Sequence, residues 1–86
     1  MKKMPKKQFD KILDLSRAYW KDGGDEILRE RIRLAQVVQK LTGVDWLHIL
    51  DFADSIVAYR GLLHDAENDE IYCALRTIGW EVVEDV

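Results

Sequence analysis

Glycine positions constrain this chain more than any other feature, because each glycine break separates stretches with helical apolar spacing. Gly23-Gly24, Gly43 and Gly79 divide segments in which apolar side chains return every three or four residues. That spacing places the apolar side chains on one side of a helix, and glycine favours the residue just past a helix end. Pro5 is the only proline, so the other common helix breaker is missing from the rest of the chain. The pattern predicts an all-α fold.

The segments predict a small helical bundle of three long helices, a short fourth helix and a C-terminal tail. The long helices are expected over about residues 5–21, from 26 to 41 or 42, and from 46 to 61 or 63, with the short helix over 69–78. Asp25 and Asp45 are placed to act as N-caps. The stretch "WEVVE" at 80–84 alternates apolar and polar residues, which also permits a strand, but the sequence shows no partner for one. We therefore expect an extended or helical tail that packs Trp80 and Val82 on the bundle.

Length and composition favour one ordinary globular domain spanning residues 1–86. A chain of 86 residues has too few side chains for two cores, and 48% apolar with 34% charged residues is far from a disordered composition. The single cysteine, Cys73, cannot form an intramolecular disulfide and is expected to be semi-buried. No apolar run approaches the roughly 18 residues that span a membrane, and the N-terminal region does not resemble a signal peptide. We expect a cytoplasmic protein without membrane contact.

The stretch "DWLHILDFAD" carries the densest group of potentially reactive side chains. His48, Asp51 and Asp54 are three residues apart and share a sector with Asp45, on the side of the helix opposite its apolar residues. A metal site in a bundle takes ligands from facing helices, often with Glu-x-x-His spacing, which this chain lacks. We therefore predict an outward, solvated or partner-binding surface, with no metal, no cofactor and no catalytic residue. Cys73 has no placed histidine or basic neighbour that would activate its thiol.

Two arginines interrupt the apolar sides of the predicted second and third helices. Arg31 and Arg60 lie near the middle of these surfaces, where an unpaired charge is costly. One interpretation is that each pairs with a carboxylate in its own chain, the candidates being Glu30, Asp54, Asp65 and Glu67. The other is that the apolar surfaces meet a second chain, where arginine bridges to a carboxylate across the interface. Both surfaces are wider than a small bundle needs, so we expect a homodimer.

Charge is distributed unevenly along the chain. Residues 1–21 have a net charge of +5, residues 22–43 balance, and residues 44–86 have a net charge of −8. Residues 1–7 are expected to form a flexible basic arm that carries Lys2, Lys3, Lys6 and Lys7. An acidic surface favours a protein partner with a basic surface. The basic arm and a stripe of Arg29, Arg33 and Lys40 instead suit nucleic acid.

The sequence favours a small intracellular protein without enzymatic activity that acts by protein–protein contact, as an adaptor, regulator or inhibitor. The candidate partner-binding residues are Arg31, Arg60, Asp45, His48, Asp51 and Asp54. A nucleic-acid-associated regulator ranks second, because aspartates on the helix that begins at Trp46 would repel phosphates. The tryptophans lie on apolar surfaces or at helix ends, not among basic residues where bases could stack. A metal-dependent enzyme built on His48 and its aspartates ranks third.

Overall fold

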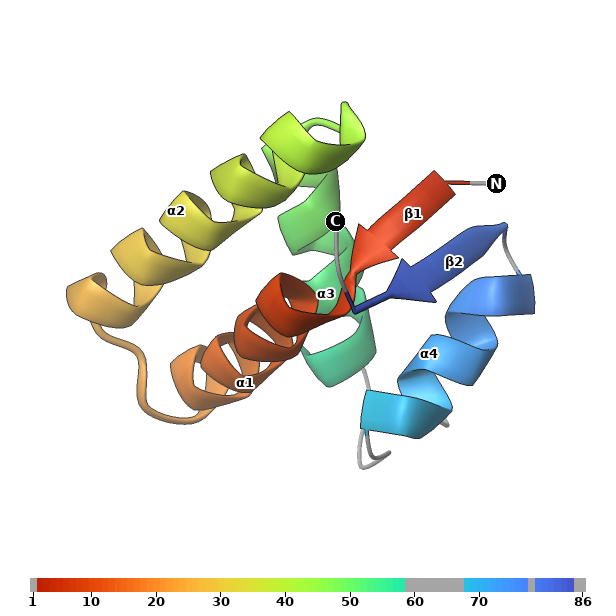
Figure 1. The fold of residues 1–86 in the computed structure, drawn as a ribbon. Coiled ribbons are helices and arrows are strands. Elements are labelled where there is room, and N and C mark those ends of the chain that lie inside the picture. Colours follow the sequence, from red (N-terminus) through yellow and green to blue (C-terminus); the bar gives the residue numbers. More distant parts are fainter. Residues whose placement is uncertain (1, 59–67, 78, 85–86) are drawn as a thin grey trace.

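The computed structural model describes residues 2–58, 68–77 and 79–84, which form a helical fold with a small sheet (Figure 1). The elements are, in chain order, β1 (Lys2–Pro5), α1 (Lys6–Asp22), α2 (Asp25–Thr42), α3 (Trp46–Ala58), α4 (Asn68–Thr77) and β2 (Trp80–Val83). The predicted bundle of three long helices and a short fourth is confirmed. The predicted end of the third helix, at residue 61 or 63, lies outside the described residues.

Local hydrogen bonds explain most of the helix ends. Gly43 has a left-handed backbone, with φ 78°, and its N–H donates to the Gln39 carbonyl at 2.8 Å, which ends α2. Asp45 is the predicted N-cap of α3, since its carboxylate accepts the Leu47 N–H at 3.2 Å. The prediction that Asp25 is the N-cap of the second helix is wrong. Asp25 is the first residue of α2, and Gly24 precedes the helix without a side-chain cap.

Two segments from distant parts of the chain form a parallel pair of strands (Figure 1). Lys2 of β1 is aligned with Trp80 of β2, and Pro5 with Val83. Met4, on β1, is only 1% exposed. The flexible arm predicted for residues 1–7 is therefore wrong, since residues 2–5 form a strand and Lys6 and Lys7 begin α1. The tail, expected to be extended or helical, is strand β2. The sequence pattern permitted a strand here, and only the lack of a visible partner counted against it.

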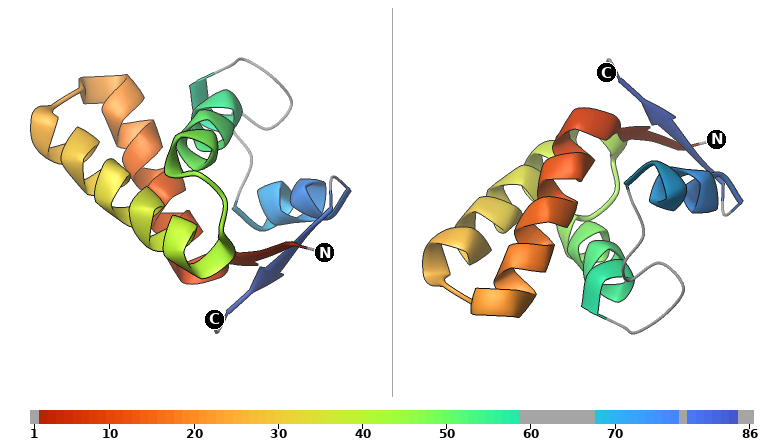
Figure 2. Two further views of the ribbon diagram at one scale, coloured as in Figure 1. Left: turned by 90° about the horizontal axis from the view of Figure 1, so that it is seen from above. Right: turned by 90° about the horizontal axis from the view of Figure 1, so that it is seen from below.

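The core lies where α1, α2 and α3 meet, and it continues under the sheet. Phe9 is fully buried, with its ring centroid 6.1 Å from that of Phe52 and 6.3 Å from that of Tyr72. Figure 2 shows α1, α2 and α3 grouped together, with α4 and the two strands on the other side. None of the described helices is both long and apolar enough to cross a lipid bilayer. The packing of α1 and α2 against α3 leaves one side of α3 outside the core.

Candidate protein-binding face

A buried arginine connects the three long helices. The Arg31 side chain, on α2, is 3% exposed, and its guanidinium donates to the carboxylate of Asp54 on α3. Its Nε also donates to the Ser16 hydroxyl on α1 at 3.2 Å, and the guanidinium carbon lies 4.8 Å from the centroid of the Tyr19 ring. The interpretation in which Arg31 pairs within its own chain is thus the one that the structure shows. Arg60, the second such arginine, lies outside the described residues.

Asp54 is the junction between this buried network and the surface. Its side chain is 26% exposed, and the oxygen that accepts from Arg31 also accepts the indole N–H of Trp20 at 3.2 Å. The prediction that Asp54 points outward with His48 and Asp51 is therefore wrong. Asp54 occupies the edge of the polar sector of α3, so α1 and α2 can both reach it. Its two partners hold the carboxylate in one orientation.

Beyond Asp54, the outer side of α3 is exposed and mixes apolar with acidic groups. Leu47, Asp51 and Asp54 follow at i, i+4 and i+7, a spacing that aligns them along one side of a helix over roughly 10 Å. Leu47 is 52% exposed, and Trp20, bonded to Asp54 at the other end, is 56% exposed. We define the α3 face by these residues and their exposed neighbours on the helix. Its members are Trp20, Leu47, His48, Asp51, Asp54 and Ser55.

The sequence analysis identified the polar members of this face and missed its apolar ones. Trp20 was assigned to the apolar side of the first helix, yet most of its side chain is outside the core because α1 ends two residues later. Leu47 could have been found, since it falls in the polar sector of the α3 wheel among aspartates. Asp45 is exposed as predicted, but its carboxylate already caps α3.

The chemistry available to the α3 face is binding through apolar contact and negative charge. No three histidine, cysteine or acidic side chains lie close enough to hold a metal ion anywhere in the described residues. His48 and Asp51 are both exposed, and Ser55 turns its hydroxyl to the Asp51 backbone carbonyl at 2.7 Å. Exposed apolar side chains rimmed by polar ones are a feature of surfaces that contact other proteins.

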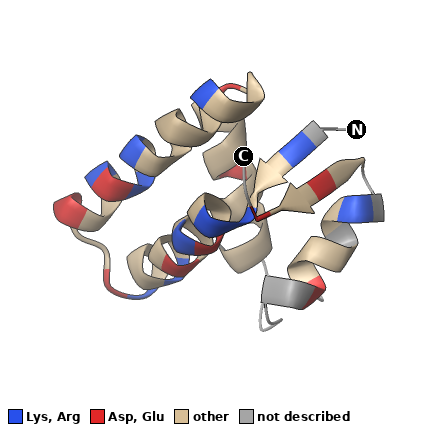
Figure 3. Cartoon of the chain, viewed as in Figure 1, with Lys and Arg blue, Asp and Glu red and all other residues tan. Residues whose placement is uncertain are grey.

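The basic residues lie mainly on α2 and at the start of α1 (Figure 3). Arg29, Arg33 and Lys40 are all exposed on α2, which agrees with the predicted basic stripe. Arg33 bonds Glu30 through two nitrogens, and this hydrogen bond holds the pKa of the Glu30 carboxyl below its ordinary value. Lys6 pairs with Asp10 at 3.5 Å. Among the N-terminal lysines whose burial the structure describes, Lys3 and Lys7 are exposed and Lys6 is half-buried.

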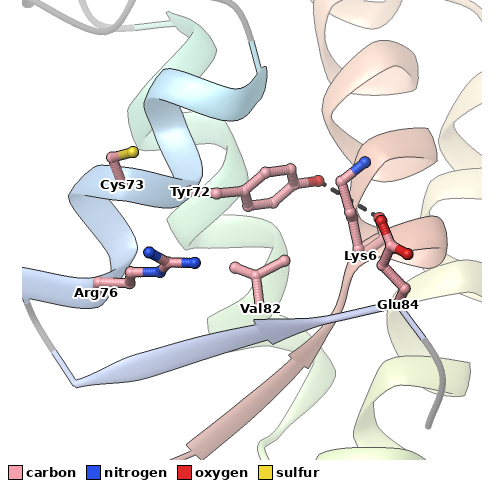
Figure 4. A pocket seen from close by; sticks show the side chains of 6 residues that line it. All are labelled: Lys6, Tyr72, Cys73, Arg76, Val82 and Glu84. Carbon is pink, nitrogen blue, oxygen red and sulfur yellow. Dashed lines mark hydrogen bonds between the residues drawn. The ribbon is translucent and has the colours of Figure 1, made fainter.

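A cavity of about 290 Å³ lies between α4, β2 and the start of α1 (Figure 4). Its lining residues are Lys6, Tyr72, Cys73, Arg76, Val82 and Glu84. The Tyr72 hydroxyl donates to the Asp10 carboxylate that also pairs with Lys6, so these polar groups already hold α4 on α1. Cys73 is exposed, not semi-buried as predicted. The sequence could not reveal this cavity, because its lining residues come from both ends of the chain and meet only in the fold.

Comparison with known proteins assigns this chain to no family. No protein-family model matches the chain, and no curated protein or solved structure matches it. The surfaces that bear on function are therefore the α3 face and the basic side of α2.

Proposed function

We propose that this chain is a small intracellular protein-interaction module, an adaptor, regulator or inhibitor without enzymatic activity, that binds basic partners and associates with itself. The observation that carries the proposal is the α3 face. There Trp20 and Leu47 are each more than half exposed beside the carboxylates of Asp51 and Asp54. A partner that covers the two apolar side chains and brings lysine or arginine to the carboxylates satisfies both kinds of group.

Trp20 is suited to act as the principal contact. Tryptophan buries up to about 250 Å², so covering its exposed half contributes roughly 3 kcal/mol at about 25 cal/mol per Å². Its indole N–H already donates to Asp54, which limits the side-chain freedom lost on binding. A cation above the indole ring adds attraction, which favours arginine or lysine in the partner. Tryptophan is also enriched among the residues that dominate binding energy at protein interfaces.

The buried network supports this surface from below. Arg31 holds Asp54, and Asp54 in turn holds Trp20, so three helices determine where the indole lies. Rigid support of this kind raises affinity, because fewer conformations are lost when the partner arrives. In this proposal Arg31 acts on binding through Asp54 and Trp20, without contacting the partner.

Affinity capture from the native host tests the proposal. The bait variants Trp20→Ala, Leu47→Ser and Asp51→Asn should each lose the protein that the unchanged chain captures. Leu41→Ser is the matched control, because Leu41 is 40% exposed on α2 and is not part of the α3 face. Capture should weaken as salt rises, since exposed charges are screened. Equal capture by all four variants contradicts the role of this surface.

The nucleic-acid alternative depends on Arg29, Arg33 and Lys40 and on the N-terminal lysines. Glu30 engages Arg33, and Lys6 pairs with Asp10, which leaves fewer cations for phosphate. We expect no binding to DNA or RNA tighter than micromolar at physiological salt. Nanomolar binding that falls steeply with salt, and is lost when Arg29, Arg33 and Lys40 become glutamate, would make this alternative the better description.

A further inference from the structure

We infer that a second copy of this chain occupies the α3 face, and that the basic side of its α2 helix makes the contact. This inference rests on the proposed function and names one partner for the same surface. The surface on α2, here called the α2 stripe, consists of Arg29, Arg33, Gln36 and Lys40, all of which are exposed.

The α2 stripe is complementary in charge to the α3 face and long enough to cover it. Arg29, Arg33, Gln36 and Lys40 follow at i, i+4, i+7 and i+11, so they extend along one side of α2 for about 16 Å. Within the described part of the chain, Arg29 and Lys40 form no salt bridge. Their charges are therefore available to carboxylates from outside the molecule.

The α3 face offers carboxylates that can accept hydrogen bonds from the basic side chains of the α2 stripe. It also offers apolar side chains that can pack against their aliphatic parts. Asp51 forms no side-chain ion pair with any described residue, and its carboxylate is exposed at the middle of the face. A guanidinium of the stripe can stack on the Trp20 ring while it donates to a carboxylate, which lysine does less well. Leu47 can lie against the aliphatic part of a long basic side chain.

One chain carries both surfaces, on two consecutive helices. The helices α2 and α3 follow one another and pack together, as the turn bond from the Trp46 N–H to the Gln39 side chain at 2.9 Å illustrates. A two-fold axis then brings each α3 face onto the other copy's α2 stripe, and the pair closes with two identical contacts. This contact replaces the one predicted through Arg31, whose guanidinium is buried within its own chain.

Sedimentation velocity on the unchanged chain is the first measurement. The chain has a mass of 10.1 kDa, so the mass should approach twice that value as concentration rises through tens of micromolar. Asp51→Lys and the double change Arg29→Glu/Lys40→Glu should each weaken the dimer at least tenfold. In both variants each contact joins two surfaces of the same sign. Circular dichroism should show unchanged helix content.

Mixing the two variants is the decisive measurement. In the mixed pair, the basic α3 face of Asp51→Lys meets the acidic α2 stripe of Arg29→Glu/Lys40→Glu. The second contact joins the unchanged acidic face of the double variant to the unchanged basic stripe of Asp51→Lys, so both contacts are complementary. A heterodimer should form where neither variant dimerises alone. Glu70→Lys on α4 and Lys7→Glu on α1 serve as matched charge controls, because both residues are exposed away from the two surfaces. These control variants should dimerise like the unchanged chain.

The results separate this inference from the proposed function. A chain that stays at 10.1 kDa up to millimolar concentration overturns the inference, together with the self-association in the proposed function. The inference alone is overturned by a dimer that both charge reversals leave intact, or by a mixture that forms no heterodimer. In each case, capture of another basic protein that depends on Trp20 and Leu47 still upholds the α3 face as a binding surface. If capture of a basic protein does not depend on Trp20 and Leu47, the proposed function is overturned whether or not the chain dimerises.

Discussion

Removing Asp54 should destabilise the protein more than removing Arg31, although the two residues form one ion pair. Asp54→Ala leaves a guanidinium whose side chain is 3% exposed without its carboxylate. An uncompensated buried charge costs about 3–5 kcal/mol. Arg31→Met leaves a carboxylate that is 26% exposed and keeps the Trp20 indole as a donor, so water can solvate it. We expect that change to cost about 1–2 kcal/mol, mainly for the lost hydrogen bonds.

The double variant Arg31→Met/Asp54→Ala should cost little more than Arg31→Met alone, because the second change no longer strands a cation. The coupling between the two sites should therefore approach the full cost of Asp54→Ala, about 3–5 kcal/mol. Urea unfolding followed by circular dichroism measures all three free energies, and a domain of this size has about 4–13 kcal/mol to lose.

The surface pair of Arg17 and Asp14, 3.2 Å apart with side chains 33% and 70% exposed, provides the control. The same substitutions there, Arg17→Met and Asp14→Ala, should each cost below about 1 kcal/mol and add nearly independently. The reasoning fails if Arg31→Met costs as much as Asp54→Ala. It also fails if the costs of the Arg31 and Asp54 substitutions simply add.

Three further predictions concern other parts of the molecule. Met4→Ala should cost about 2–4 kcal/mol in urea unfolding, because Met4 is 1% exposed under the sheet, and a cost below about 0.5 kcal/mol would indicate that β1 does not pack there. In an NMR titration the Glu30 carboxyl should titrate below its ordinary pKa and return towards it in Arg33→Gln. A carboxyl whose pKa is lowered by folding stabilises the folded protein above the unfolded pKa, and this stabilisation is lost as pH falls through the folded pKa. If the pKa of Glu30 proves unshifted, the carboxyl makes no such contribution. Calorimetry with zinc or manganese on chelator-treated protein should show no submicromolar binding, and a stoichiometric heat that disappears in His48→Ala would overturn the assignment of the α3 face.

The helices were predictable because their signals are local. Apolar spacing and the glycine at position 43 indicate helix ends and buried sides without knowledge of any other segment. Asp45 as an N-cap follows from the same local chemistry, and it is present in the structure. The error at Asp25 is small, because Gly24 takes the flanking position and moves the helix start by one residue.

The sheet and the contacts of Asp54 were not predictable, because they depend on distant segments of the chain. Nothing in "KKMP" indicates a strand until Trp80 to Val83 lies beside it. Asp54 falls in a polar sector, and only the packing of α1 and α2 turns its carboxylate towards Arg31 and Trp20. The sequence analysis did include Asp54 among four possible partners of Arg31, but it could not choose among them.

The pairing of β1 with β2 also sets an order of events during synthesis. β1 is made before α1, whereas β2 follows α4, so the first strand waits for its neighbour while nearly all the described chain is translated. At about 5–20 residues per second this delay lasts roughly 4–16 s. Helices α1 and α2, which are adjacent along the chain, can pack during that interval, since nearby segments close small loops. Met4 meets Val82, its partner across the sheet, only when β2 arrives and joins the two ends of the fold.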